Sequence, residues 1–125
     1  MSRRVLVVED EEDLRDIARF TLEGAGFEVI EAVNGVEGVA KAEAEAERPD
    51  LVLMDIQMPQ LDGYEATRRI KALPGMQQSL VVAVSSFAMK GDEEKARAAG
   101  CDAYVTKPYS PKQLLPLVRQ FLAKT

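Results

Sequence analysis

The stretch Val5-Leu6-Val7-Val8-Glu9-Asp10 is an apolar run of strand length that ends in two acids. Three later runs share this form: residues 51–54 precede Asp55, residues 80–84 precede Ser85, and residues 103–106 precede Lys107. The carboxyl ends of parallel strands lie along one edge of a sheet, and ligands bind in the crevice there. We therefore expect the residues that end these runs to converge on one site.

Runs of strand and helix character alternate along the whole chain, which is typical of an α/β fold with a parallel sheet. The pattern predicts strands near residues 4–9, 27–32, 50–55, 79–85 and 102–107, and helices near residues 11–24, 35–47, 63–73, 88–99 and 111–123. The first, third and fourth strands are almost entirely apolar, so both of their faces should be covered. The second strand alternates and the fifth is short, so both belong at the edges. The sequence therefore predicts a doubly wound five-stranded parallel sheet in the order 2-1-3-4-5, with helices on both faces.

Local signals mark the ends of several helices. Asn34 followed by Glu37 predicts a capping pair for the second helix, which residues 48–49 (Arg-Pro) should end. Pro111 suits the first position of the last helix. Pro116 lies about one turn further on, where it removes a hydrogen bond, so this helix should either start later or be kinked in its first turn.

The expected site has a coherent chemistry. Glu9, Asp10 and Asp55 cannot all stay ionised side by side without a cation. Oxygen ligands without histidine or cysteine favour Mg²⁺. Lys107 and Ser85 suit an anion held beside that metal, most simply a phosphoryl group. Each residue alone has an ordinary explanation as a helix-terminal acid, a turn former or a loop residue, but together they occupy the ends of four predicted strands.

Composition limits the class of protein. The 125 residues fit one domain, and the net charge of −5 argues against nonspecific binding to nucleic acid or anionic membranes. The sequence contains no apolar stretch of the roughly 18 residues that a membrane-spanning helix needs. Cys101 is the single cysteine, so no intrachain disulfide can form and a cytoplasmic location is expected. The chain has no histidine, so it cannot carry a phosphohistidine itself.

Four separated motifs resemble the receiver domain of response regulators. They are Val7-Val8-Glu9-Asp10, residues 53–59 (Leu-Met-Asp-Ile-Gln-Met-Pro) with Asp62-Gly63, residues 83–85 (Ala-Val-Ser), and residues 104–108 (Tyr-Val-Thr-Lys-Pro). They occur in the family's order and span essentially the whole chain. The segment 87–93 is most similar to stand-alone regulators of the chemotaxis and cell-cycle types. The resemblance implies a flavodoxin-like receiver domain over residues 1–125, with no effector domain.

The resemblance also implies roles for individual residues. Asp55 matches the phosphorylated aspartate, and with Glu9 and Asp10 it would hold Mg²⁺, or Mn²⁺ as an alternative ion. Gln57 would add its backbone carbonyl to the metal, and Lys107 matches the lysine that contacts the phosphoryl group. Glu9 stands where Asp is more usual, but it keeps the carboxylate.

Further positions match the switch and the lifetime of the phosphoryl group. Ser85 matches the switch hydroxyl, where Thr is more usual, and Tyr104 matches the switch aromatic. Gln57 and Phe87 lie where receiver domains tune access of the hydrolytic water, and the large apolar Phe87 predicts a long-lived phosphoryl group. The Lys107-Pro108 peptide bond is expected to be cis.

The implied function is that of a phosphorelay signalling protein. It would accept a phosphoryl group on Asp55 from a histidine kinase or a histidine phosphotransfer protein in a Mg²⁺-dependent reaction. It would not be a turnover enzyme, since it would catalyse only its own phosphorylation and slow autodephosphorylation. The surface of the fourth helix, fifth strand and fifth helix would then change and bind a downstream protein. We expect a monomer or weak dimer that binds neither nucleic acid nor membrane.

Three alternatives stay open at this point. A flavodoxin-like carrier on the same fold needs a hydroxyl- and glycine-rich phosphate loop after the first strand, where this chain has the acidic residues 9–13. A Mg²⁺-dependent phosphatase that forms an aspartyl-phosphate usually has a second acid two residues after the nucleophile, where this chain has Gln57. A receiver-like scaffold that is never phosphorylated would not need the complete set of site residues.

Overall fold

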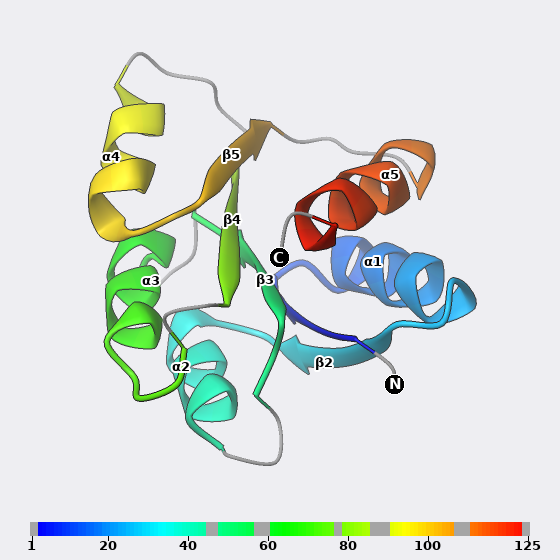
Figure 1. The fold of residues 1–125 in the computed structure, drawn as a ribbon, viewed down its shortest axis with the longest axis horizontal. Coiled ribbons are helices and arrows are strands. Elements are labelled where there is room, and N and C mark those ends of the chain that lie inside the picture. Colours follow the sequence, from blue (N-terminus) through cyan, green and yellow to red (C-terminus); the bar gives the residue numbers. More distant parts are fainter. Residues whose placement is uncertain are drawn as a thin grey trace.

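A single parallel sheet organises the molecule. The computed structural model describes residues 3–44, 48–56, 61–76, 79–85, 91–106 and 111–123. The strands are β1 (Arg4–Val8), β2 (Glu28–Ala32), β3 (Leu51–Asp55), β4 (Leu80–Ser85) and β5 (Ala103–Thr106), in the order β2-β1-β3-β4-β5 (Figure 1). All four neighbouring pairs are parallel, which confirms the predicted fold class and strand order.

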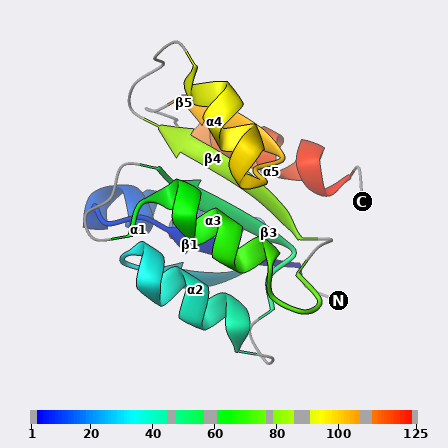
Figure 2. The ribbon, with the colours of Figure 1, turned by 90° about the vertical axis from the view of Figure 1, so that its left-hand side faces the viewer.

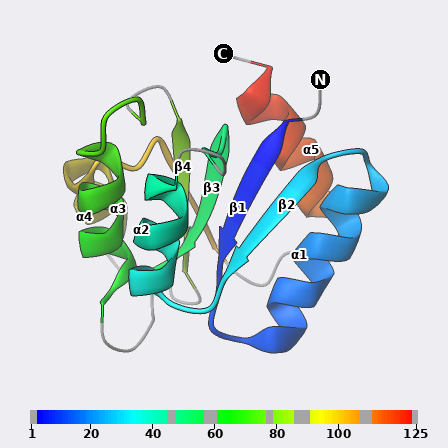
Figure 3. The same cartoon turned by 90° about the horizontal axis from the view of Figure 1, so that it is seen from below.

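In the part of the chain that the structure describes, five helices cover the two faces of the sheet. They are α1 (Glu12–Gly24), α2 (Gly35–Glu43), α3 (Gly63–Lys71), α4 (Asp92–Ala99) and α5 (Pro111–Leu122). Figure 3 shows α1 and α5 on one face and α2, α3 and α4 on the other. In Figure 2, α2, α3 and α4 lie in a row in front of the sheet. Among the described residues, no helix is both long and apolar enough to cross a membrane.

The three apolar strands feed two separate cores because successive side chains point to opposite faces of a sheet. Leu6, Val52 and Val81 pack with α2, α3 and α4 in one cluster. Their neighbours in sequence, such as Val7 and Val82, pack with α1 and α5 in the other. Residues of β1, β3 and β4 are nearly all buried, whereas β2 and β5 are largely half-buried, as predicted for edge strands.

The second helix begins as predicted and ends early. Asn34 Oδ1 accepts a hydrogen bond from the Glu37 N–H at 2.8 Å, and Glu37 Oε1 accepts one from the Val33 N–H at 3.3 Å. The predicted end near residue 47 is wrong, because α2 stops at Glu43 and Ala44 is extended, with ψ of 116°. Ala42 is the last buried residue of α2, and helix propensity alone does not sustain a further turn without tertiary packing.

The fourth and fifth helices also differ in part from the sequence prediction. A start of α4 at residue 88 is wrong, because Gly91 has φ of +90° and lies outside the helix that begins at Asp92. The fifth helix starts at Pro111 as predicted and continues through Pro116. Pro116 is exposed, so water can bond the backbone carbonyl that lacks its helical partner.

Polar contacts of Lys71 and Asp102, together called the latch, join α3, β4 and β5 at the amino-terminal edge of the sheet. The Asp102 Oδ2 atom accepts a hydrogen bond from the Val81 N–H at 2.8 Å and lies 3.0 Å from Lys71 Nζ. Lys71 Nζ also donates to the Ser79 carbonyl at 2.6 Å. One ammonium and one carboxylate therefore tie a helix to the starts of two strands.

Asp102→Ala should destabilise the fold through loss of this latch. The Val81 N–H would lose its acceptor and Lys71 its ion partner, so the free energy of unfolding should fall by about 1–3 kcal/mol. Urea denaturation followed by circular dichroism measures the change. Glu93→Ala is a suitable control, since it removes an exposed pair with Arg97 and should change stability by no more than about 0.5 kcal/mol. Equal effects in the two variants would contradict a structural role for the latch.

Candidate functional site

Three carboxylates meet at the carboxyl-terminal edge of the sheet. Ligand oxygens of Glu9, Asp10 and Asp55 lie within 4.8 Å of one another. Glu9 and Asp55 are 2% and 3% exposed, whereas Asp10 is exposed. The cluster therefore has a buried floor and an opening to solvent, as the positions of these residues at the strand ends predicted.

The register between β1 and β3 sets this geometry. Val8 is paired with Met54, so the next residue on each strand, Glu9 and Asp55, falls side by side. The Glu9 N–H donates to the Ala32 carbonyl at 3.0 Å, which extends the pairing with β2 by one residue beyond β1. The hydrogen bond to β2 thus fixes the backbone N–H of the first acid.

The loop from β1 into α1 holds Glu9 from its other side. One carboxylate oxygen of Glu9 accepts a hydrogen bond from the Glu11 N–H at 3.2 Å. The guanidinium of Arg15 donates to the Glu9 backbone carbonyl at 2.9 Å. Arg15 was not among the predicted site residues, and the signal that could have found it is a basic residue in the second turn of a helix that starts at the site.

The end of β3 is packed tightly against the start of α3. The Ile56 N–H donates to the Val84 carbonyl at 3.0 Å, and the Gly63 N–H donates to the Ile56 carbonyl at 3.2 Å. A Cβ atom at Gly63 would collide with the Asp55 carbonyl oxygen and lie 2.7 Å from the Cα of Ile56. Asp62 caps α3 by accepting a hydrogen bond from the Glu65 N–H at 2.9 Å, so Asp62 and Gly63 form the start of this helix.

Ser85 and Tyr104 lie on the same face of neighbouring strands. Ser85 is 1% exposed and ends β4. It is paired with Thr106, while Tyr104 is paired with Ala83, so alternation places both side chains on the face covered by α4. Tyr104 is half-buried and packs against the core of that face. The structure thus places both residues on one face of two neighbouring strands, and their predicted role as a switch pair stays a prediction.

Several predicted site residues lie outside the described ranges. They are Gln57, Phe87, Lys107 and Pro108, and their predicted roles, including the cis peptide bond, stay predictions. The described strand β5 ends at Thr106, directly before Lys107 and opposite the buried Ser85.

The carboxylate cluster fits a hard divalent cation. Two carboxylates about 4 Å apart repel by about 4 kcal/mol at an effective dielectric constant of about 20, and burial of Glu9 and Asp55 limits screening by water. An ion with two positive charges offsets this repulsion, and oxygen-only donors match the preference of Mg²⁺. The residues present therefore suit the metal that the sequence predicted.

Two side chains near α3 and α4 have raised pKa values, which makes them unsuited to nucleophilic chemistry. Burial raises the pKa of the Tyr64 phenol, and the neighbouring Asp92 and Tyr104 raise it further. Burial also raises the pKa of the Cys101 thiol, although its hydrogen bond with Thr67 acts in the opposite direction. Both groups are therefore neutral at neutral pH, and Cys101 is an inert core residue.

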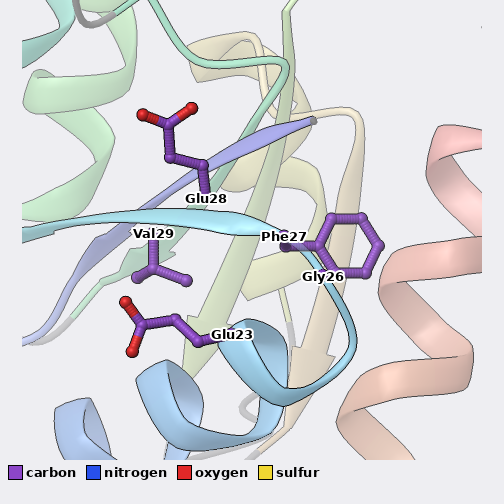
Figure 4. A pocket seen from close by; sticks show the side chains of 5 residues that line it. All are labelled: Glu23, Gly26, Phe27, Glu28 and Val29. Carbon is purple, nitrogen blue, oxygen red and sulfur yellow. The ribbon is translucent and has the colours of Figure 1, made fainter. Parts of the chain in front are cut away.

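A pocket lies at the amino-terminal edge of the sheet, opposite the carboxylate cluster and beside the turn from α1 into β2. Figure 4 shows its lining residues, which are Glu23, Gly26, Phe27, Glu28 and Val29. Val29 points toward α1, whereas Glu28 projects from the opposite face of β2. The Oε2 atom of Glu28 lies 3.1 Å from Arg4 Nε. This pocket shares no residue with the carboxylate cluster and is separate from the candidate site.

The fold and the site together define a signalling module. The chain belongs to the response regulator receiver domain family, whose match covers residues 5–119. It is therefore a phosphoacceptor domain of two-component signalling, as its sequence motifs predicted. Members of this family bind Mg²⁺ at an acidic pocket and interact with histidine kinases or phosphotransfer proteins and with downstream targets.

Individual relatives agree with this assignment. The chain is 40% identical over 122 residues to the polar-differentiation response regulator DivK of Brucella anthropi, and the match covers 98% of each protein. Its fold is similar to that of a CheY-like receiver domain protein from Methanospirillum hungatei, with a TM-score of 0.91, 31% identity and coverage of 99% of this chain and 96% of the other.

A third relative bears on the metal. It is the receiver domain of a sensor histidine kinase from Pseudomonas aeruginosa, with a TM-score of 0.87, 30% identity and coverage of 98% of this chain and 99% of the other. Its structure has a magnesium ion coordinated in the active-site cleft. The flavodoxin-like carrier and the phosphatase are not favoured by any of these similarities.

Gly63→Ala should disturb the site and the fold together. The new Cβ would press on the Asp55 carbonyl, and overpacking of this kind costs about 1–3 kcal/mol. Thermal unfolding measures the loss. Gly24→Ala is the matched control, because no atom lies within 4 Å of a Cβ at that position and stability should not fall. A Gly63→Ala protein as stable as Gly24→Ala would show that α3 can move away from β3 freely.

Proposed function

We propose that Asp55 is the residue of this receiver domain that accepts the phosphoryl group. The observation that carries the proposal is the position of Asp55, buried at the end of β3 with carboxylates of Glu9 and Asp10 within 4.8 Å. A buried carboxylate beside two further acids is poised for a cation and an anion to bind together. Glu9, Asp10 and Asp55 would hold Mg²⁺, with Mn²⁺ as an alternative and the backbone carbonyl of Gln57 as a further ligand.

The proposed reaction moves one phosphoryl group. An oxygen of Asp55 forms the new P–O bond, the P–N bond to the imidazole of the donor breaks, and the electron pair returns to the imidazole nitrogen. With a small acyl phosphate, the P–O bond to the acyl group breaks instead and the carboxylate leaves. Mg²⁺ held by Glu9, Asp10 and Asp55 would supply positive charge beside the transferring group. The chain itself positions the Asp55 oxygen through the β3 register and the α3 packing, and positioning together with charge neutralisation does most of the work when the nucleophile is weak.

The proposed switch follows from the added charge. Phosphorylation turns one negative charge into about two and adds acceptor oxygens. Ser85 would donate a hydrogen bond to the new group, and Lys107 would contact another of its oxygens. Movement of Ser85 would make space on the face that it shares with Tyr104, which would turn inward. The surface of α4, β5 and α5 would then change shape and bind a downstream protein.

The remaining proposals concern the setting of this reaction. The donor would be a histidine kinase or a histidine phosphotransfer protein, and the chain would act as a monomer or weak dimer in the cytoplasm. The net charge of −5 speaks against nucleic acid or anionic membranes as partners. A single receiver domain over residues 1–125 stays a prediction. So does the restriction of its catalysis to its own phosphorylation and slow autodephosphorylation.

Asp55→Asn should abolish phosphorylation, because an amide cannot act as the acceptor. Incubation with acetyl phosphate and Mg²⁺, followed by intact-protein mass spectrometry, should show an added phosphoryl group on the unaltered chain and none on the variant. Removal of Mg²⁺ with EDTA should have the same effect as the substitution.

Asp50→Asn is the matched control for this experiment. Asp50 lies directly before the other end of β3, and its carboxylate accepts a hydrogen bond from the Arg4 N–H at 2.8 Å, which an amide oxygen can replace. This variant should be phosphorylated at the rate of the unaltered chain. Uptake of the phosphoryl group by Asp55→Asn at that rate would rule out Asp55 as the acceptor.

Phe87→Ala should shorten the lifetime of the phosphoryl group. A smaller side chain two residues after Ser85 would admit the hydrolytic water more readily. The decay of phosphorylated protein after removal of acetyl phosphate gives the rate, which should increase in the variant. Phe20→Ala, on the exposed surface of α1, serves as the control for loss of an aromatic ring and should leave the rate unchanged. An unchanged rate in Phe87→Ala would refute the proposed tuning role.

A further inference from the structure

A single side chain joins the carboxylate cluster to the neighbouring helix and strand. Arg15 lies in the second turn of α1, and its guanidinium donates to the Glu9 backbone carbonyl at 2.9 Å. The side chain of Arg15 is 15% exposed, so the contact is largely shielded from water. The N–H of Glu9 bonds to β2, so the two backbone groups of this acid are fixed by different elements.

The other side of the same guanidinium faces an acid on β2. Arg15 Nε lies 3.8 Å from Glu31 Oε1, and the Glu31 backbone carbonyl accepts a hydrogen bond from Lys41 Nζ of α2 at 2.7 Å. Glu31 therefore offsets part of the positive charge of Arg15. This reduces the repulsion between Arg15 and a cation in the cluster.

A neighbouring arginine shares the acid but not the contact with the site. Arg19 Nε lies 3.9 Å from the same Glu31 oxygen, and its guanidinium also contacts Asp16 and the ring of Phe20. Arg15 and Arg19 thus differ in one respect that matters here, which is the hydrogen bond to the Glu9 carbonyl. This difference gives a comparison within one helix.

We propose that Arg15 is a positioning residue for the divalent-ion site, acting through the backbone of Glu9. The contact holds the peptide after β1 so that the Glu9 carboxylate stays beside Asp10 and Asp55. Without it, the loop would sample orientations in which the carboxylate is turned away, and ion binding would have to restore the order. This inference rests on the proposed metal site and adds a residue outside its ligands.

The test measures ion affinity separately from stability and from phosphorylation. Mn²⁺ binding is followed by electron paramagnetic resonance and Mg²⁺ binding by competition, for the unaltered chain and for Arg15→Ala, Arg15→Lys and Arg19→Ala. Loss of a group that orients a metal ligand typically weakens affinity by 10-fold or more, so we expect roughly a 10-fold weaker affinity in Arg15→Ala. Arg19→Ala should bind as the unaltered chain does.

Two further readouts separate positioning from a general loss of structure. In Arg15→Ala, the Mg²⁺ concentration for half-maximal phosphorylation by acetyl phosphate should rise, while the rate at saturating Mg²⁺ should stay near that of the unaltered chain. Arg15→Lys keeps the charge but cannot contact the carbonyl and Glu31 with the same fork, so its affinity should be intermediate. If Arg15→Ala does not fold, Arg15→Lys decides the question by itself.

The outcomes distinguish failure of this inference from failure of the metal site. Equal or tighter ion binding in Arg15→Ala, or an equal loss in Arg19→Ala, would overturn the positioning role while leaving the site intact. Binding by Arg15→Lys equal to that of the unaltered chain would show that charge alone suffices, which also overturns it. The absence of ion binding by the unaltered chain would overturn the metal site and the role of Arg15 together.

Discussion

The hydrogen-bonded register between β1 and β3 is the constraint on which the remaining structure depends. It pairs Val8 with Met54 and so sets Glu9 beside Asp55. A shift by one residue would turn every side chain of one strand to the opposite face, which would mix the two cores and separate the acids. The apolar burial that fixes the register therefore also assembles the charged site. The free energy of this packing offsets the repulsion between the acids.

Buried polar side chains occur at a few places in an otherwise apolar interior. Among the described residues, the buried polar or charged ones are Glu9, Asp55, Thr67, Ser79 and Ser85. The hydroxyls of Thr67 and Ser79 each donate a hydrogen bond to a backbone carbonyl at 2.7 Å, so both have a partner within the fold. The other three all stand at the carboxyl-terminal edge of the sheet. Three of these five buried polar residues thus lie at the site.

The sequence allowed prediction of the strands and of their convergence, because both follow from a short-range pattern and from the geometry of parallel sheets. Apolar runs that end in Asp55 or Ser85 need no knowledge of distant contacts to be recognised. The end of α2 and the start of α4 were less predictable, since they depend on where packing stops and on the left-handed backbone of Gly91. The sequence shows a basic residue near the start of the helix that follows the site, but it does not show that Arg15 contacts Glu9, because a long flexible side chain has many possible partners.

The fourth helix is framed by glycines in a left-handed conformation, Gly91 with φ of +90° and Gly100 with φ of +106°. Between them, Ala96 and Ala99 are the buried residues of α4, and neither has a large side chain to anchor it. If this segment unwound or tilted, it would therefore give up only the small apolar contacts of these two alanines. The domain would then change on one flank while the strand register that holds the acidic pocket stayed in place, which is the behaviour that the proposed switch needs.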